Sequence, residues 1–291
     1  MENQTKNKME TKKKNKGIWV VLSIFWVIIM VVNGGCIGGG KEPVDELTVI
    51  GSTTVLPLAQ KTADAFMDKN TNASIQVSGG GSSVGIQAVD SGTADIGIAS
   101  RDLKDNEKES YPNLVQHVVA KDGIAIIVHP SNPVSSLTEE QVKGIYNRTY
   151  TDWNELGGDD QQIVVVSRDT ASGTREFFFE YVMKKGDFTK GALEKNSNGA
   201  VQLTVAQTPG AIGYVGLGYV DSTIKAVKIN ANGQLVEPTV QNILEGKYPI
   251  ARSLNMFTNG EAAGLTKEYL DFIMSKEGQK IVKEEGFVPV N

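Results

Sequence analysis

Short apolar runs alternate with loops rich in glycine and hydroxyl residues along most of the chain. Residues 74–77 alternate polar and apolar positions like a strand, residues 47–50 are mostly apolar, and residues 163–166 are uniformly apolar. A segment with helical spacing follows each loop, beginning at about Leu56, at Ile86 and after Thr174. This recurring order of strand, loop and helix predicts an α/β protein.

Further elements follow the same pattern. The apolar runs at residues 96–99, 115–119, 124–128, 210–215 and 251–257 predict strands. Thr138-Glu139-Glu140-Gln141 has the form of a capping box and predicts a helix to about Tyr146. Residues 265–282 predict one long helix. Pro130 and Pro133 interrupt the pattern and suggest a crossing point between two lobes.

Three loops carry the candidate chemistry, at residues 51–54, 78–85 and 167–174. Each follows a predicted strand and precedes a predicted helix, a position from which backbone N–H groups can bind an anion. Arg168 in the third loop has a rigid guanidinium fork that suits a tetrahedral oxyanion. For any single loop, a helix cap or a plain turn is the simpler explanation. The three together favour one pocket for a small oxyanion.

A serine hydrolase is a competing hypothesis. Gly81-Ser82-Ser83-Val84-Gly85 matches the nucleophile-elbow pattern, with Ser83 as the nucleophile. However, the chain has only two histidines, His117 and His129, whereas the histidine of an α/β-hydrolase follows the acid and comes last. The glycine loop also lacks the lysine of a P-loop, and no His/Cys cluster suggests a metal site.

The N-terminus has the pattern of a secretory signal. Six lysines lie among the first 16 residues, and residues 18–32 are apolar apart from Ser23. This run is shorter than the roughly 20 residues that a membrane-spanning helix needs. Residues 1–35 are therefore predicted to be a signal peptide of an exported protein, with an uncleaved N-terminal anchor as the alternative.

Cys36 is the only cysteine and follows small residues. Its surroundings resemble a lipoprotein processing site, which implies that Cys36 is the point of lipid attachment. Asn33 departs from the aliphatic residue usual in bacterial sites. An incidental free thiol is the alternative. With lipidation, residues 36–46 would form a flexible tether.

The net charge of −5 argues against nucleic acid as a partner. Removal of residues 1–35 would take away six lysines and two glutamates and leave the protein more acidic. Any anion must then be captured by local donors, because the overall field repels it.

Four motifs in this order resemble the phosphate-binding proteins of phosphate ABC transporters. They are Gly51-Ser52-Thr53-Thr54-Val55, Gly79-Gly80-Gly81-Ser82-Ser83, the stretch at 94–101 and the stretch at 168–174. The resemblance runs from about Leu47 to the C-terminus and includes residues 211–214 and 248–250. It implies a two-lobed, type 2 periplasmic-binding-protein fold, in which each lobe is a mixed sheet flanked by helices. Lobe 1 would combine residues 47–127 with 248–291, lobe 2 would be residues 128–247, and two hinge crossovers would join them.

The resemblance also implies a function. The protein would capture inorganic phosphate outside the cell and pass it to the membrane permease of an ABC importer. It would act as a monomer, anchored by lipid to the outer face of the cytoplasmic membrane, without catalysis, cofactor or metal. The alternative within the same fold is another tetrahedral oxyanion, such as sulfate, molybdate or tungstate.

The implied phosphate-binding residues come from all four motifs. They are Ser52, Thr53, Thr54, Ser82, Ser83, Ser100, Arg101, Arg168, Ser172, Gly173 and Thr174. Ser100 stands where the best-known family members carry an aspartate that accepts the proton of hydrogen phosphate, and it can accept only weakly. Arg101 would add a second cation, or would instead pair with Asp102 or Asp105 at the surface.

Overall fold

The computed structural model describes residues 44–291. The predicted signal peptide, Cys36 and most of the predicted tether lie outside the described residues. The first strand, β1 (Asp45–Gly51), begins two residues earlier than the sequence pattern suggested. Asp45 and Glu46 already pair with Ala73 and Ser74 of β2 (Ala73–Gly79), so the end of the presumed tether is part of the sheet.

A mixed sheet in the order β2-β1-β3-β12-β4-β8-β6-β7 forms the framework, with β9 paired to β4. Its remaining strands are β3 (Ile96–Ala99), β4 (Leu114–Val128), β6 (Val164–Arg168), β7 (Leu193–Lys195), β8 (Ala211–Gly216), β9 (Lys225–Ala226) and β12 (Ala251–Asn259). A small second sheet contains β5 (Ser136–Thr138), β10 (Lys228–Ala231) and β11 (Gln234–Val236).

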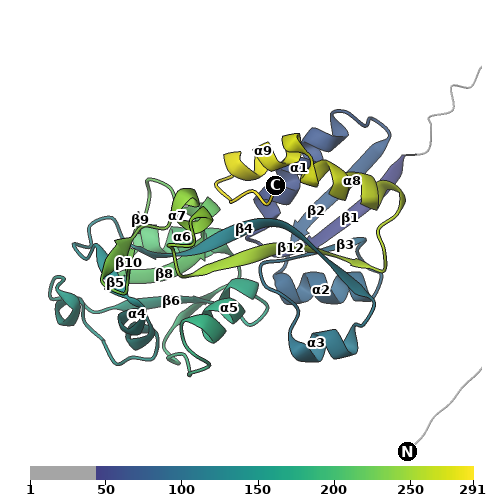
Figure 1. Cartoon of the computed structure of the whole chain (residues 1–291). Helices are drawn as coiled ribbons and strands as arrows, with labels where there is room; N and C mark the ends of the chain where they lie inside the picture. The colour runs from purple at the N-terminus through teal and green to yellow at the C-terminus, as the bar shows by residue number, and fades with distance from the viewer. Residues whose placement is uncertain (1–43) are drawn as a thin grey trace, which may run out of the picture. The chain divides into compact units, whose positions relative to one another are not determined.

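Strands β4 and β12 run through both halves of the described chain (Figure 1). The sequence pattern suggested two strands at 115–119 and 124–128, but the structure has one strand of 15 residues. The intervening residues stay extended because they continue to pair with β12 as far as Gly123. From Ile124 onward β4 pairs with β8 instead, so the chain passes between the halves ahead of Pro130 and Pro133.

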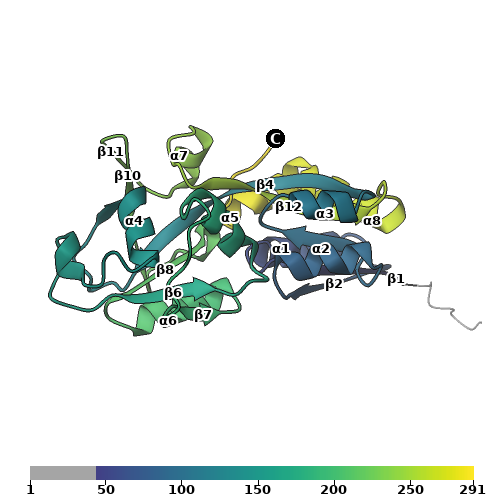
Figure 2. The ribbon, with the colours of Figure 1, turned by 90° about the horizontal axis from the view of Figure 1, so that it is seen from below.

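One half contains β1, β2, β3 and five helices, which gather at one end of the view in Figure 2. The helices are α1 (Leu56–Met67), α2 (Ser82–Asp90), α3 (Asp105–Ser110), α8 (Gly264–Met274) and α9 (Lys276–Glu284). The single helix predicted over residues 265–282 is wrong, because the chain breaks at Ser275. The Ser275 side chain accepts the backbone N–H of Gly278 and caps a new helix there.

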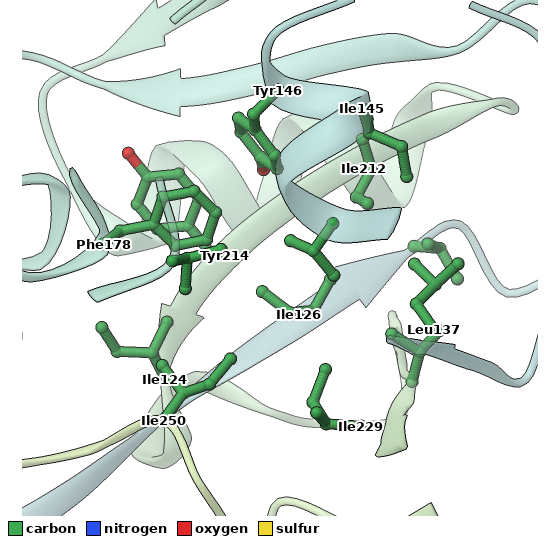
Figure 3. Packing of buried hydrophobic residues seen from close by; sticks show 14 of the residues in the cluster. Ile124, Ile126, Leu137, Ile145, Tyr146, Phe178, Ile212, Tyr214, Ile229 and Ile250 are labelled. Atoms are coloured by element: carbon green, nitrogen blue, oxygen red, sulfur yellow. The ribbon is translucent and has the colours of Figure 1, made fainter. Parts of the chain in front are cut away.

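The other half contains α4 (Glu139–Tyr146), η1 (Trp153–Leu156), α5 (Gly173–Tyr181), α6 (Asn198–Gln207), η2 (Leu217–Tyr219) and α7 (Val240–Leu244). The capping box at Thr138 is confirmed, since its side chain accepts the backbone N–H of Gln141. The aromatic residues of α5 pack into the core, where the rings of Phe178 and Tyr214 stack at 4.2 Å (Figure 3).

This aromatic core also positions the end of β6. The hydroxyl of the buried Tyr214 accepts the backbone N–H of Arg168 at 3.2 Å and lies 2.9 Å from the hydroxyl of Ser167. Burial raises the pKa of Tyr214, so its phenol stays protonated. The backbone of Arg168 is therefore fixed by the core before its side chain reaches the candidate site.

Candidate functional site

The three loops singled out from the sequence meet around one small cavity. The loops after β1 and β2 lie in one half, and the loop after β6 lies in the other. The cavity encloses about 100 Å³ and is lined by Ser52, Thr53, Thr54, Gly81, Ser82, Ser100, Arg168, Ser172, Gly173 and Thr174. Nine of the eleven residues expected from the sequence thus come together at one point.

Local structure explains why the loops converge. Strands β1 and β2 are parallel and in register up to Gly51 and Gly79, so the segments that follow them leave the sheet side by side. The α2 and α5 helices begin at Ser82 and Gly173, which directs their first backbone N–H groups toward the cavity. The aligned peptide dipoles favour negative charge at both helix starts.

Gly81 allows the two halves to touch. Its φ of +103° lies in a region that favours glycine, and a Cβ at this position would lie 2.6 Å from the carbonyl oxygen of Ala171. The next turn makes a direct link, because the backbone N–H of Ser83 donates to the same Ala171 oxygen at 3.2 Å. A second link joins the hydroxyl of Tyr219 to the carbonyl oxygen of Thr53 at 2.6 Å. Burial raises the pKa of Tyr219 to about 12, so this hydroxyl keeps its proton to donate.

Arg168 provides the positive charge of the cavity. It is 1% exposed, and its guanidinium donates to the carbonyl oxygens of Lys195 and Asn196 and to the Thr53 hydroxyl at 3.1–3.3 Å. The remaining nitrogen, Nη1, is buried and has no hydrogen-bond partner. Burial lowers the pKa of Arg168, but a guanidinium stays charged at any physiological pH.

Ser83 and Arg101 do not line the cavity. The Arg101 guanidinium forms a fork with both carboxylate oxygens of Glu107 at 2.6 and 2.7 Å. The same group donates to the Ser83 hydroxyl at 3.1 Å. The carboxylate matches the two parallel N–H groups of arginine, so it holds Arg101 beside α2 and α3. The sequence offered Asp102 and Asp105 as surface partners of Arg101. In the structure, the carboxylate that Arg101 contacts belongs to Glu107.

The hydrolase hypothesis finds no base beside Ser83. His117 Nε2 lies 3.0 Å from the Thr258 hydroxyl, and His129 Nδ1 lies 2.7 Å from the Ser131 hydroxyl. These are the two histidines of the whole chain, and neither lines the cavity. The described neighbour of the Ser83 hydroxyl is a guanidinium, which donates a proton and cannot accept one.

Sequence reasoning missed three buried polar residues behind the cavity. Asn198 is fully buried, and its side-chain nitrogen lies 3.2 Å from the Thr53 hydroxyl and 2.9 Å from the Thr54 hydroxyl. Arg252 donates to Asp122 at 2.8 and 3.1 Å and to the Thr54 hydroxyl at 3.4 Å. None of the three lies in the loops at 51–54, 78–85 and 167–174, so only the three-dimensional arrangement connects them with the cavity.

The described residues contain neither a metal-binding cluster nor a membrane-spanning helix. Among residues 44–291, no group of three or more His, Cys, Asp or Glu side chains could hold a metal ion. In the same range, no helix has both the length and the apolar character required to cross a bilayer.

Comparison with known proteins places the chain in a defined group. A family model described as a PBP superfamily domain matches residues 39–277. The chain is 35% identical to the phosphate-binding protein PstS of Bacillus subtilis over 290 residues, which cover 96% of this chain and 95% of that protein. It is 32% identical to the PstS protein of Pseudomonas aeruginosa, covering 84% of this chain and 83% of the relative.

Solved structures agree in fold and sequence. One solved structure is named a putative phosphate ABC transporter substrate-binding protein with bound phosphate, from Clostridium perfringens. It is 40% identical to this chain, with a TM-score of 0.80. The match covers 85% of this chain and all of that one. An ABC-type phosphate transport receptor from Vibrio cholerae is 33% identical with a TM-score of 0.69, covering 83% of this chain and 99% of that one.

Proposed function

We propose that this chain, which belongs to the PBP superfamily and within it to the phosphate-binding proteins of phosphate ABC transporters, captures inorganic phosphate for an import permease. It belongs to the extracytoplasmic substrate-binding proteins, so it delivers the anion and does not itself form the path across the membrane. The fold expected from the sequence, the type 2 periplasmic-binding-protein fold, is confirmed.

One observation carries the proposal: a buried guanidinium nitrogen, Arg168 Nη1, lacks a partner beside a cavity lined by hydroxyls. A buried donor without a partner costs about 1–3 kcal/mol or more when charged, and an oxyanion would supply the missing acceptor. The space between the lining atoms is only about 100 Å³, which leaves no room for an organic ligand. Size and charge together favour a small inorganic anion.

The proposed binding set consists of the lining residues. Hydroxyl donors come from both halves, backbone N–H donors from the starts of α2 and α5, and the charge from Arg168. The residues are Ser52, Thr53, Thr54, Ser82, Ser100, Arg168, Ser172, Gly173 and Thr174. No carboxylate is among the lining residues, which fits a multiply charged anion. Ser83 and Arg101 support the glycine loop from behind and are not assigned a contact with phosphate.

Phosphate binding is coupled in this proposal to closure of two lobes, residues 47–127 with 248–291 and residues 128–247. The anion would be held by loops of both lobes, so it would favour the closed arrangement over an open one. The direct links from Ser83 to Ala171 and from Tyr219 to Thr53 support this arrangement, because they join the same two halves beside the cavity.

Titration calorimetry with phosphate, sulfate and molybdate tests the choice of anion. We expect tight binding of phosphate and at least 100-fold weaker binding of the other two, because each presents a different size or proton count to fixed donors. Equal affinity for sulfate would contradict selectivity for phosphate. The absence of phosphate binding would refute the proposed function as a whole.

We also propose that the protein performs no catalysis. Incubation with a chromogenic ester should give no turnover, since Ser83 has a guanidinium and not a base beside its hydroxyl. Turnover that disappears in Ser83→Ala would contradict this expectation and revive the hydrolase hypothesis.

Anchoring and assembly complete the proposal. Cleavage after residue 35 would leave Cys36 as a lipidated N-terminus at the outer face of the cytoplasmic membrane, with the monomer docking on its permease. Mass spectrometry of the mature N-terminus should find a diacylated cysteine, and size-exclusion chromatography with light scattering should find one copy. An unmodified Cys36, or an intact residue 1–35 segment, would refute the lipid anchor.

A further inference from the structure

The serine hydroxyls of the cavity already accept hydrogen bonds from within the protein. Three of them take a backbone N–H: Ser52 from Thr54 at 3.2 Å, Ser82 from Ser100 at 3.1 Å and Ser172 from Arg175 at 3.2 Å. A hydroxyl has one proton and two lone pairs. A donor from behind fills one lone pair and leaves the O–H free to donate into the cavity.

Asn198 plays the corresponding role for Thr53 and Thr54. Its Nδ2 lies 3.2 Å from the Thr53 hydroxyl and 2.9 Å from the Thr54 hydroxyl. Asn198 is the first residue of α6 and is fully buried, but it does not line the cavity. Asn198 therefore contacts two residues of the anion site from the opposite half, but it is not positioned to contact the anion itself.

The orientation of this amide is determined by its other end. Asn198 Oδ1 accepts the backbone N–H of Gly216 at 3.2 Å. A backbone N–H can only donate, so the oxygen must face Gly216 and the amino group must face the threonines. The two amino protons then serve Thr53 and Thr54, one each.

A guanidinium adds a second donor at each threonine. Arg168 Nη2 donates to Thr53 at 3.3 Å, and Arg252 Nη2 donates to Thr54 at 3.4 Å. With both lone pairs filled, each threonine can use its hydroxyl only as a donor. Thr53 is left to donate toward the cavity.

The donor role of Thr54 also fixes the direction of a hydrogen bond at a third hydroxyl, that of Thr174. Thr54 Oγ1 lies 3.0 Å from Thr174 Oγ1, and Thr54 must be the donor of this pair because its lone pairs are filled. The proton of Thr174 is then free for the cavity. The Asn198 amide, together with Arg168 and Arg252, thus determines the direction of the hydrogen bonds at Thr53, Thr54 and Thr174.

We propose that Asn198 is a positioning residue that turns these threonine hydroxyls into donors and so makes this wall of the site complementary to unprotonated phosphate oxygens. The inference rests on the proposed phosphate function. It also gives Asn198 a part in specificity, because a ligand oxygen that carries a proton would find no acceptor along this wall.

A double-mutant cycle on the full chain, with phosphate as the ligand, tests the proposal. We expect Asn198→Ala and Thr53→Val each to weaken phosphate binding about 10- to 100-fold, the range for lost hydrogen bonds to a charged group. The double variant should bind within about threefold of the weaker single variant, because Asn198 acts partly through Thr53. If the loss of phosphate affinity in the double variant equals the product of the two single losses, the proposal is overturned and Asn198 only supports α6.

Asn198→Asp provides a second, independent variant. It keeps an acceptor for Gly216 but presents a carboxylate oxygen to Thr53 and Thr54. That oxygen would draw the Thr53 proton away from the cavity and the Thr54 proton away from Thr174. We expect a greater loss of phosphate affinity than in Asn198→Ala, with a smaller change in the midpoint of thermal unfolding. Asn113→Asp, at an exposed position, makes the same chemical change and should bind like the wild type.

The outcomes separate this inference from the proposed function. Phosphate binding by the wild type together with unchanged binding, within twofold, in Asn198→Asp would overturn the role of Asn198 alone. A wild type that does not bind phosphate would refute the function itself.

Discussion

Lys104 Nζ lies 2.8 Å from Glu176 Oε2, and this ion pair joins α3 to α5 across the two halves of the molecule. The side chains are 34% and 21% exposed, so water screens the pair only in part. Helix α5 begins at Gly173, in the wall of the cavity. The pair therefore holds the start of α5, which we propose binds the anion, against the opposite half of the molecule.

Glu176→Gln should accelerate phosphate release. A partly exposed pair contributes about 0.2–1 kcal/mol, so we expect a dissociation rate up to about fivefold faster and a smaller change in association. Stopped-flow fluorescence measures both rates. Asp271→Asn is the matched control, since it breaks the exposed Lys267–Asp271 pair within α8, far in sequence from the cavity loops. Equal changes in the two variants would show that the Lys104 pair has no special role in closure.

Gly81→Ala should prevent complete closure. The new Cβ would lie 2.6 Å from the Ala171 carbonyl oxygen, so either the loop or the opposite half must move. We expect at least a tenfold loss of phosphate affinity in calorimetry.

Gly92→Ala is the control for this substitution. Gly92 also has a positive φ, of +71°, but nothing lies within 4 Å of its added Cβ. Both variants should lose about 1 kcal/mol of stability from backbone strain. Only Gly81→Ala should lose affinity. A comparable loss in Gly92→Ala would trace the effect to stability and not to closure.

Local chemistry explains how much of the site could be predicted from the sequence. A single loop of glycine, serine and threonine between a strand and a helix is usually a cap or a turn, but three such loops with an arginine favoured one anion pocket. The loops at Thr53, Ser82 and Ser172 all line the cavity. The strands and helices that flank these loops, such as β1, α1 and β6, were predicted for a related reason, because hydrophobic periodicity is set within each element.

Long-range pairing explains what could not be predicted. Asn198 follows a serine at a helix start, where a polar residue is usual, and its partner Thr54 lies 144 residues away. Arg101 has acidic neighbours at several spacings, and only the fold of α3 selects Glu107 among them. The joining of two apolar runs into β4 likewise depends on β12, which is more than 120 residues further along.

Arg168→Ala should weaken phosphate binding strongly. Loss of a buried charged partner costs roughly 2–5 kcal/mol, which calorimetry would register as a loss of about 30-fold to several thousandfold. Arg168→Lys should recover only part of this, because an ammonium cannot reproduce the fork between Thr53, Lys195 and Asn196. A loss below about 0.5 kcal/mol in Arg168→Ala would place this residue outside the anion site, since exposed pairs have that magnitude.

Glu107→Gln should destabilise the protein in a pH-dependent way. Burial acts to raise the pKa of Glu107, but the Arg101 fork and the backbone N–H of Lys104 outweigh it, and the pKa lies below the ordinary 4.5. A carboxylate with a lowered pKa in the folded state contributes stability that is present above the unfolded pKa and lost as the pH falls through the folded value. We therefore expect Glu107→Gln to lose about 1–3 kcal/mol of unfolding free energy at pH 7.

The same comparison in acid distinguishes charge pairing from packing. As the pH falls through the lowered pKa of Glu107 in the folded state, the wild-type carboxyl takes up its proton and resembles the glutamine, so the difference in unfolding free energy should shrink toward zero. Urea unfolding across this pH range measures it. Glu109→Gln, exposed on the same helix, should stay within about 0.5 kcal/mol of the wild type at every pH. If the difference for Glu107→Gln persists at low pH, Glu107 stabilises α3 through its cap geometry. The contact between Glu107 and Arg101 would then not depend on the charge of the carboxylate.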